Sequence, residues 1–358
     1  MSNAQQSIPF LVIAGSVDCF GFLSNALIFT YLFFNRVGSK LTTTLMKNQL
    51  AFDALISGFA LCSLLVNNKL FENLGPFSVL FCRLWVSRTI FWFLVLLSEI
   101  NLLCISVDRI RAVAFSASYR QHGKITLISY YAAIFIYSSV FALPSIFTVT
   151  HIGSACKHRL VMVSDNTLDV YMFVYSYLWL FTGYLIPVTV MAGCYVTIVI
   201  LMRKIILKSL KNSGEPSVST GERNTDAFSS GPTKLSRFSR SFIVTAIVMW
   251  SVFLVTHAYY TIFAILCTHS VIDFDPESVT RRVGIFTTVL NSAVNPLIMV
   301  LSSPPFRHGL WRFLQSFTAA VTITTRTDVT SEDRTSRKCA SAPKQNLPSS
   351  HIGSRSAE

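Results

Sequence analysis

The sequence predicts an all-α membrane protein, a seven-helix transmembrane bundle followed by a short amphipathic eighth helix. Of its 358 residues, 52% are hydrophobic and only 13% are charged, whereas a soluble domain carries about 25% charged residues. Seven apolar segments are long enough to cross a bilayer as helices, which takes about 20 residues. Polar residues recur inside these segments, and such residues normally face neighbouring helices rather than lipid.

The seven segments follow one another with polar connections between them. We expect helices over 8–34, 45–66, 84–107, 125–149, 171–202, 241–267 and 283–302. The first segment lacks a basic start and is too long for a typical signal peptide, so we interpret it as a retained helix. The fifth contains no Asp, Glu, Lys or Arg between Tyr171 and Met202.

The chain is expected to divide into a bundle and three polar segments. Residues 1–7 form a short N-terminus, 8–315 the bundle with its eighth helix, and 316–358 a disordered tail. A flexible loop over about 204–239 is rich in Ser, Thr and Gly. The eighth helix is predicted because apolar residues recur at helical spacing with arginines between them, next to an interfacial tryptophan. These residues are Phe306, Leu310, Phe313 and Leu314, with Arg307, Arg312 and Trp311.

Basic residues predict how the chain is oriented in the membrane. The loops after the first, third and fifth segments are rich in Lys and Arg, while the opposite loops mix both signs. Because basic loops stay in the cytoplasm, we expect a multi-pass plasma-membrane protein with its N-terminus outside and its C-terminus inside. The net charge of +13 is explained by attraction to anionic lipid and to an intracellular partner. Nucleic acid is a poor explanation, since the basic residues border apolar segments.

Two of the eight cysteines, Cys82 and Cys156, fall clearly in loops expected to be extracellular. That compartment is oxidising, so we expect a disulfide between them. It would pin the second outer loop to the start of the third helix. The alternative is two unpaired cysteines.

Polar side chains inside the spans predict a buried cluster. They include Asn25, Asp53, Ser98, Glu99, Asn291, Ser292 and Asn295. An ionised Asp in mid-membrane costs about 2.5–3.5 kcal/mol on insertion scales, so it is expected to face the interior. Asn291 and Asn295 lie one helical turn apart on one face. Asp53, Ser98, Asn291 and Asn295 are the expected ligands of a sodium ion, and no other cofactor is expected. The same residues would serve equally as hydrogen bonds between helices without an ion.

Ordered motifs through the spans carry a resemblance to a known family. They are Gly21–Asn25 in the first segment, Leu50–Asp53 in the second, Ser106–Ile110 in the third, Pro187 and Tyr195 in the fifth, and Asn291–Met299 in the seventh. The last reads Asn-Ser-Ala-Val-Asn-Pro-Leu-Ile-Met, and the third ends in Asp108-Arg109. In order and spacing the chain resembles the rhodopsin-like (class A) G protein-coupled receptors over about residues 8–315.

Several positions depart from the family pattern. Met299 replaces the usual Tyr, and Thr256-His257-Ala258-Tyr259 stands where the family has Cys-Trp-x-Pro. Glu99 replaces a usual apolar residue near the core switch. These departures put the family's detailed activation mechanics in question without threatening the fold. Divergence of this kind resembles that of invertebrate orphan receptors.

The resemblance implies a signalling mechanism. Asp108 would hold Arg109 in the resting state, and an extracellular agonist would favour outward movement of the sixth helix and free Arg109 for a heterotrimeric G protein. Tyr195 would support that contact, while Asn295 and Pro296 would serve the switch in the last helix. Serines and threonines of the tail would be sites for kinases and arrestin, although plain disorder explains them equally well.

The expected ligand pocket is aromatic with a basic mouth. Its predicted residues are Arg88, Phe91, Trp92, Tyr175, Trp179, His257, Tyr260 and Arg281. This set suits a peptide or a lipid with an acidic head. Alignment from Arg109 places Phe91 where amine receptors carry their ammonium-binding Asp, so a monoamine is not expected. The last helix has no Lys between Val283 and Leu301, which excludes a retinal Schiff base.

A transporter or channel is the alternative from a different class. Asp18, Asp53 and Glu99 would then line a path through the membrane. The odd number of segments and the absence of inverted repeats favour the receptor. An enzyme is not expected, because the sequence has no metalloprotease, nucleophile-elbow or phosphate-loop motif.

Overall fold

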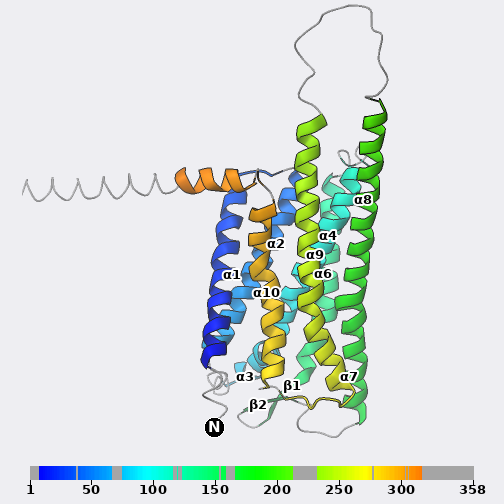
Figure 1. The fold of residues 1–358 in the computed structure, drawn as a ribbon. Coiled ribbons are helices and arrows are strands. Elements are labelled where there is room, and N and C mark those ends of the chain that lie inside the picture. The colour runs from blue at the N-terminus through cyan, green and yellow to red at the C-terminus, as the bar shows by residue number, and fades with distance from the viewer. Residues whose placement is uncertain are drawn as a thin grey trace, which may run out of the picture. The chain divides into compact units, whose positions relative to one another are not determined.

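A computed structural model of the chain describes residues 8–37, 39–66, 75–115, 119, 123–152, 155–158, 166–212, 232–275, 278–302, 304 and 306–316. Among these residues, seven helical spans are long and apolar enough to cross a membrane. All seven belong to one compact unit, Met1–Arg307. The predicted all-α, seven-helix membrane fold is therefore confirmed (Figure 1).

The long helices are α1 (Ile8–Phe34), α2 (Lys40–Leu65), α4 (Thr89–Ala114), α6 (Gly123–Ala142), α8 (Ile186–Asn212), α9 (Pro232–Thr268) and α10 (Val279–Ser302). Shorter helical elements are α3 (Phe77–Phe81), η2 (Cys82–Val86), η3 (Leu143–Thr148), α7 (Asn166–Leu178) and η5 (Trp179–Leu185). Strands β1 (Val149–Ile152) and β2 (Ala155–His158) form an antiparallel pair. Helix α4 is central in this arrangement, since it packs against α2, α6 and α8.

Several helices extend beyond the apolar segments that predicted them. Helix α2 starts at Lys40 rather than 45, because the Ser39 hydroxyl caps it by accepting a bond from the Thr42 amide. Helix α4 continues to Ala114 through the charged residues after 107. Helices α8 and α9 likewise reach into the expected loop over 204–239. Hydrophobicity marks the bilayer, whereas a helix continues until its backbone hydrogen bonds end.

Three expected segments lie wholly or largely outside the described residues. They are the N-terminus 1–7, the part of the loop over 213–231, and the tail after 316. Residues 306–316 are helical, within the range expected for the eighth helix and one residue beyond. Its place on the membrane surface stays a prediction.

Proline shapes the helix that contains Pro187. The seven residues of η5 form π-helix and end two residues before this proline. Proline has no N–H to donate to the carbonyl four residues earlier, so the preceding turn loses a regular α-helical bond. A π-turn is one way in which a helix accommodates such a break. In α10, by contrast, the helix runs through Pro296.

Close packing of α1 against α2 and α10 depends on Gly21. A Cβ added to Gly21 would lie 2.6 Å from Ser57 Oγ and 3.0 Å from Ala293 Cβ. One turn further along α1, the Asn25 side-chain amide donates to the Ser292 carbonyl at 3.0 Å. The small residue lets the backbones approach, and the amide then joins them.

Candidate functional site

An aromatic cavity of about 130 Å³ opens near the β1–β2 pair. The rings of Trp92 on α4, Tyr175 on α7, Trp179 on η5 and Tyr260 on α9 line it, together with Arg281 on α10. The Trp92 ring lies 4.4 Å from that of Tyr260 and 5.1 Å from that of Trp179, measured between centroids. Arg281 lies over the Phe274 ring at 5.4 Å and is only 7% exposed. The cavity thus combines an apolar body with one buried cation.

Five of the eight predicted pocket residues line this cavity, and three do not. Phe91 packs into the apolar core and is only 1% exposed. Arg88 lines a different cavity, next to α1. His257 is buried and faces Glu99. The sequence assigned them by depth along their helices, but the direction of each side chain depends on how the helix is rotated.

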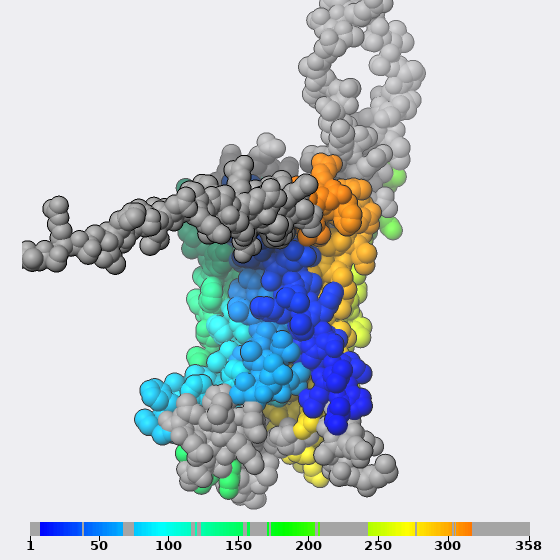
Figure 2. Space-filling model, turned by 90° about the vertical axis from the view of Figure 1, so that its left-hand side faces the viewer, coloured from blue at the N-terminus to red at the C-terminus, as the bar shows by residue number. Residues whose placement is uncertain are grey.

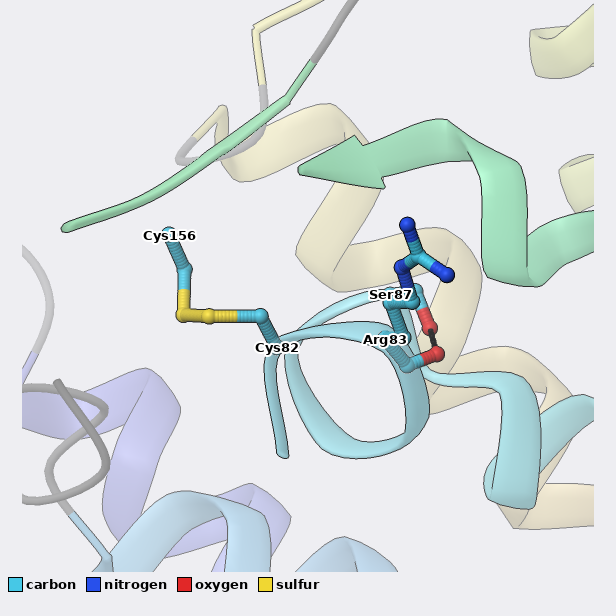
Figure 3. The surroundings of a disulfide bond; sticks show 4 residues. All are labelled: Cys82, Arg83, Ser87 and Cys156. Atoms are coloured by element: carbon cyan, nitrogen blue, oxygen red, sulfur yellow. Dashed lines mark hydrogen bonds between the residues drawn. A yellow bond between two sulfur atoms is a disulfide. The ribbon is translucent and has the colours of Figure 1, made fainter. Parts of the chain in front are cut away.

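A disulfide between Cys82 and Cys156 confirms the predicted bridge (Figure 3). The Cα atoms of the two residues are 5.5 Å apart. It fastens β2 to η2, which precedes α4. Arg88, between η2 and α4, has a left-handed backbone with φ of 60°. The bridge therefore fixes the hairpin beside the start of the central helix.

Asp53 is the centre of a buried polar network. Its carboxylate accepts hydrogen bonds from Ser98 Oγ at 2.7 Å, Asn295 Nδ2 at 2.7 Å and Gln49 Nε2 at 3.1 Å. These bonds join α2, α4 and α10. Asp53 and Asn295 are fully buried. Three of the four predicted sodium ligands therefore meet at one point.

The fourth, Asn291, is buried, and its side-chain oxygen has no hydrogen-bond partner among the described residues. The side-chain oxygen of Asn295 is also without one. Gln49 and Asn101 extend the network, since Asn101 Nδ2 donates to Gln49 Oε1 at 2.9 Å. Sequence reasoning missed both. Gln49 lies one turn before Asp53 on the same helix face, which is the signal that would have found it.

Glu99 and His257 form a buried acid–histidine pair between α4 and α9. Glu99 Oε1 lies 3.1 Å from His257 Nε2, and both side chains are nearly inaccessible to solvent. The other face of the imidazole packs on Phe253, with ring centroids 4.3 Å apart. A carboxylate in such a place is costly unless a partner offsets its lost hydration. Two residues that depart from the expected family motifs therefore face each other across the α4–α9 contact.

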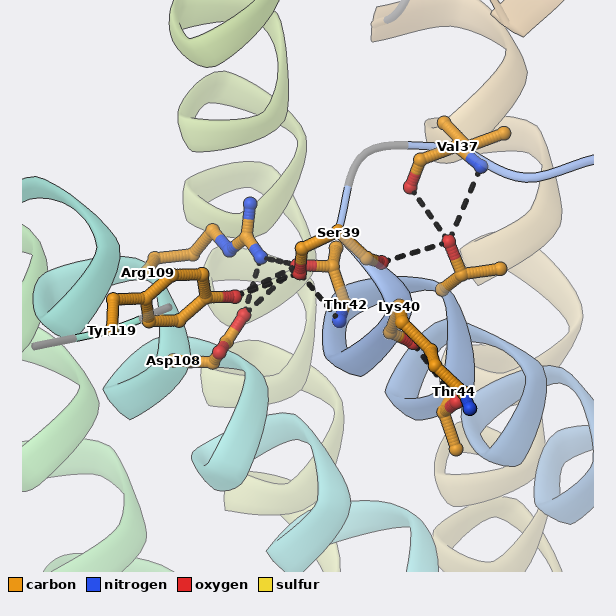
Figure 4. A network of polar contacts seen from close by, with 9 residues as sticks. Val37, Ser39, Lys40, Thr42, Thr44, Asp108, Arg109 and Tyr119 are labelled. Atoms are coloured by element: carbon orange, nitrogen blue, oxygen red, sulfur yellow. Dashed lines mark hydrogen bonds and ion pairs between the residues drawn. The ribbon is translucent and has the colours of Figure 1, made fainter. Parts of the chain in front are cut away.

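Asp108 and Arg109 form an ion pair (Figure 4). They lie near the end of α4, whereas the cavity residue Trp92 lies near its start. Arg109 also donates to the Thr42 hydroxyl, which in turn donates to Asp108 Oδ2 at 3.1 Å. Asp108 is fully buried. The pair is therefore tied to the first turn of α2, a contact that the sequence did not reveal.

Tyr119 closes this cluster from the segment after α4. Its hydroxyl lies 2.8 Å from Ser39 Oγ and 3.5 Å from Thr42 Oγ1. Burial, and then the nearby charge of Asp108, raise the pKa of Tyr119 above its ordinary value of 10. The phenol therefore stays protonated at neutral pH and can donate a hydrogen bond.

Tyr195 and Met299 lie near the same end of the bundle. The Tyr195 hydroxyl is 2.5 Å from Ser106 Oγ, so it contacts α4 two residues before Asp108. Met299 is buried and lines a small cavity that Arg109 also lines. The predicted switch residues Asp108, Arg109 and Tyr195 thus gather at one end, whereas Asn295 joins the Asp53 network.

Comparison with known families decides what this architecture is. A family model described as 7 transmembrane receptor (rhodopsin family) matches residues 24–299, which is most of the chain. The chain belongs to the rhodopsin family of seven-transmembrane receptors. The receptor is accordingly a multi-pass membrane protein. A search of curated proteins finds no significant match.

The motifs that suggested the resemblance lie within the matched region. The matched region includes Asp53, Asp108-Arg109 and Asn295-Pro296. It also includes Glu99 and His257, the facing residues of α4 and α9.

Proposed function

We propose that the receptor binds an extracellular ligand in the aromatic cavity and activates heterotrimeric G proteins at the opposite end of the bundle. The observation that carries the proposal is the buried Asp108–Arg109 pair, tied to Thr42 at that end. An ion pair held by hydrogen bonds is an element with two states, because Arg109 is either bound or released. Family membership supports this function over the transporter or channel.

The N-terminus and the disulfide lie on the extracellular side in this proposal. Support comes from the basic residues, which gather in the loops at the Asp108–Arg109 end. The plasma membrane is the proposed location, because an extracellular ligand must reach the cavity. Kinases and arrestin would act on the tail, which lies outside the described residues.

The ligand in this proposal is a peptide or a lipid-like molecule with an acidic group. The aromatic rings that line the cavity offer apolar contact, and Arg281 offers a buried cation for a carboxylate or phosphate. No Asp or Glu lines the cavity among the described residues. An ammonium ligand would meet Arg281 without an anion to pair with, which argues against a monoamine.

Activation would begin with release of Arg109. A ligand that binds more tightly when α9 has moved away from α4 shifts the population toward that state. Arg109, once released from Asp108 and Thr42, would then be available to the G protein. Tyr195 would support it from α8 after leaving Ser106.

Breaking the Asp108–Arg109 ion pair is expected to raise basal signalling. Replacing Asp108 with Asn removes a charge-assisted bond of about 1.5–3 kcal/mol, so basal output should rise by roughly ten- to a hundredfold. Thr42→Val should also raise it, whereas Arg109→Ala should abolish signalling. Each variant is measured with a panel of chimeric G proteins at matched surface level.

Thr44 provides the matched control for Thr42. It lies on the same helix, but among the described residues its hydroxyl bonds only to the Lys40 carbonyl of its own turn (Figure 4). Thr44→Val should leave basal output unchanged. Unchanged output from both Asp108→Asn and Thr42→Val would contradict the proposal that this ion pair holds the resting state. Ion currents that disappear with Asp53→Asn would instead favour the channel alternative.

We propose a sodium ion as an allosteric ligand at Asp53. The residues fit, because the unpartnered oxygens of Asn291 and Asn295 accompany a buried carboxylate and the Ser98 hydroxyl. Bound sodium would stabilise the resting bundle by neutralising Asp53.

Sodium should therefore raise the stability of the purified receptor. At ten times the dissociation constant, NaCl should add about 1.4 kcal/mol relative to choline chloride of equal ionic strength. Asp53→Asn should remove this difference, as measured by thermal unfolding. Equal stability of the wild type in both salts would show that the cluster only joins the helices.

A further inference from the structure

A second cavity, of about 220 Å³, lies between α1, α2 and α10. It shares no lining residue with the aromatic cavity. Phe10 and Ala14 line it from α1, Ala60 from α2, and Phe286 and Val289 from α10. The three helices lie side by side on one face of the bundle (Figure 2). A cavity of 150 Å³ in another protein accommodates benzene, so this one is large enough for a small organic ligand.

Asp18 on α1 also lines this cavity and is the only charged residue of that helix. It is 3% exposed and forms no hydrogen bond or ion pair with the described residues. Among the described residues, the other buried acids each lie against a polar or basic group: Asp53 in its hydrogen-bond network, Glu99 at 3.1 Å from the His257 imidazole, and Asp108 beside Arg109. An unpaired buried carboxylate is costly, so its presence beside a cavity points to a ligand.

Basic residues stand toward the other end of the same cavity. Phe10 and Phe286 mark one level, since their ring centroids are 5.8 Å apart. Asp18 lies eight residues further along α1, which is about 12 Å at 1.5 Å per residue. Arg282 lies one turn before Phe286, in the opposite direction, and also lines the cavity. The Asp18 carboxylate is therefore deep in the bundle, and the Arg282 guanidinium is near the N-terminal ends of α1 and α10.

Arg88 is the second basic residue that lines the cavity. Its backbone has φ of 60°, a region that residues other than glycine rarely adopt. Strained backbone of this kind persists where surrounding structure holds a side chain in a required place. Both arginines have other contacts in the structure, yet a guanidinium has five N–H donors and can serve several acceptors.

We propose that this cavity binds an elongated zwitterion, with an ammonium at the deep end and an acidic group at the mouth. The ammonium pairs with Asp18, and the apolar chain of the ligand lies against Phe10, Ala60 and Phe286. The acidic group contacts Arg88 and Arg282. A simple amine would satisfy Asp18 but would be repelled at the mouth, and a simple acid would leave Asp18 unpaired.

Thermal unfolding of the full-length purified receptor tests the proposal without any signalling readout. The probes are 4-aminobutanoate, 6-aminohexanoate and 8-aminooctanoate, with hexylamine and hexanoate as single-charge controls. At least one zwitterion should raise the unfolding midpoint, with a dissociation constant at least tenfold below that of either control. Failure of all three zwitterions, or equal binding of hexylamine, would overturn it.

Variants of α1 separate binding from folding. Asp18→Asn should remove the response to the zwitterion, and Ala14→Leu should block it by filling the cavity. Ser16→Ala is the matched control, because within the described part of the chain the exposed Ser16 hydroxyl bonds only to the Val12 carbonyl. Without ligand, Asp18→Asn should be at least as stable as the wild type. A lower midpoint in this variant, or an unchanged ligand response, would show that Asp18 has a structural role instead.

Discussion

Replacing His257 with Phe is expected to lower the free energy of unfolding by about 3–5 kcal/mol, because it leaves Glu99 buried without a partner. The Phe ring keeps most of the contact that the imidazole makes with Phe253, so lost packing contributes little. Thermal unfolding of the purified receptor measures the change. The effect should be among the largest of any single substitution in the bundle.

The double variant Glu99→Leu, His257→Phe should recover nearly all of this loss. Replacing both members of a buried pair with apolar residues is often neutral or stabilising. His269→Phe serves as the control, since that histidine bonds to Tyr177 at an exposed site and should cost less than about 1 kcal/mol. A double variant as unstable as His257→Phe alone would contradict a pairwise interaction.

The pair also has a consequence for activation. It joins α4 to α9, the two helices that separate in the proposed mechanism. Any movement of α9 must either carry Glu99 along or leave its carboxylate unpaired. The double variant should therefore signal more strongly at rest although its stability is restored. This outcome separates a role in switching from a role in stability alone.

The fold was largely predictable because bilayer thickness sets the length of each apolar segment in the sequence. Seven apolar segments predicted seven spans, and the loop cysteines Cys82 and Cys156 predicted the bridge. The helix ends were less predictable. The start of α2 depends on a Ser39 cap, and α4 continues through charged residues that lie beyond its apolar run.

The candidate site was predictable where chemistry restricted the partners. A buried Asp53 needs hydrogen bonds, and few polar residues in the spans can supply them, so Ser98 and Asn295 were found. Thr42 was missed, because a threonine in the first turn of a helix is ordinary in sequence. The contact between Glu99 and His257 was also missed. It depends on how α4 and α9 are rotated about their axes, which no local pattern records.

Removing the Cys82–Cys156 bridge is expected to cost about 2–4 kcal/mol. The two residues are 74 positions apart. Closing so long a loop removes entropy from the unfolded chain, which raises its free energy by roughly 4 kcal/mol at 25 °C. Helices that persist in the membrane already restrict the unfolded chain, which reduces the gain. The variant Cys82→Ser, Cys156→Ser measures it by thermal unfolding, and Cys62→Ser is the control because that exposed cysteine is free.

The bridge should matter more for ligand binding than for the rest of the bundle. It holds β2 against η2 (Figure 3), and Ser87 and Thr148, which flank η2 and β1, line the aromatic cavity. Without the bridge the hairpin is fastened only by its own strand pairing and side-chain contacts. Ligand affinity should therefore fall in the double serine variant even at temperatures where the bundle stays folded, and a reductant should have the same effect on the wild type. Affinity that is insensitive to both treatments would mean that the hairpin does not shape the cavity.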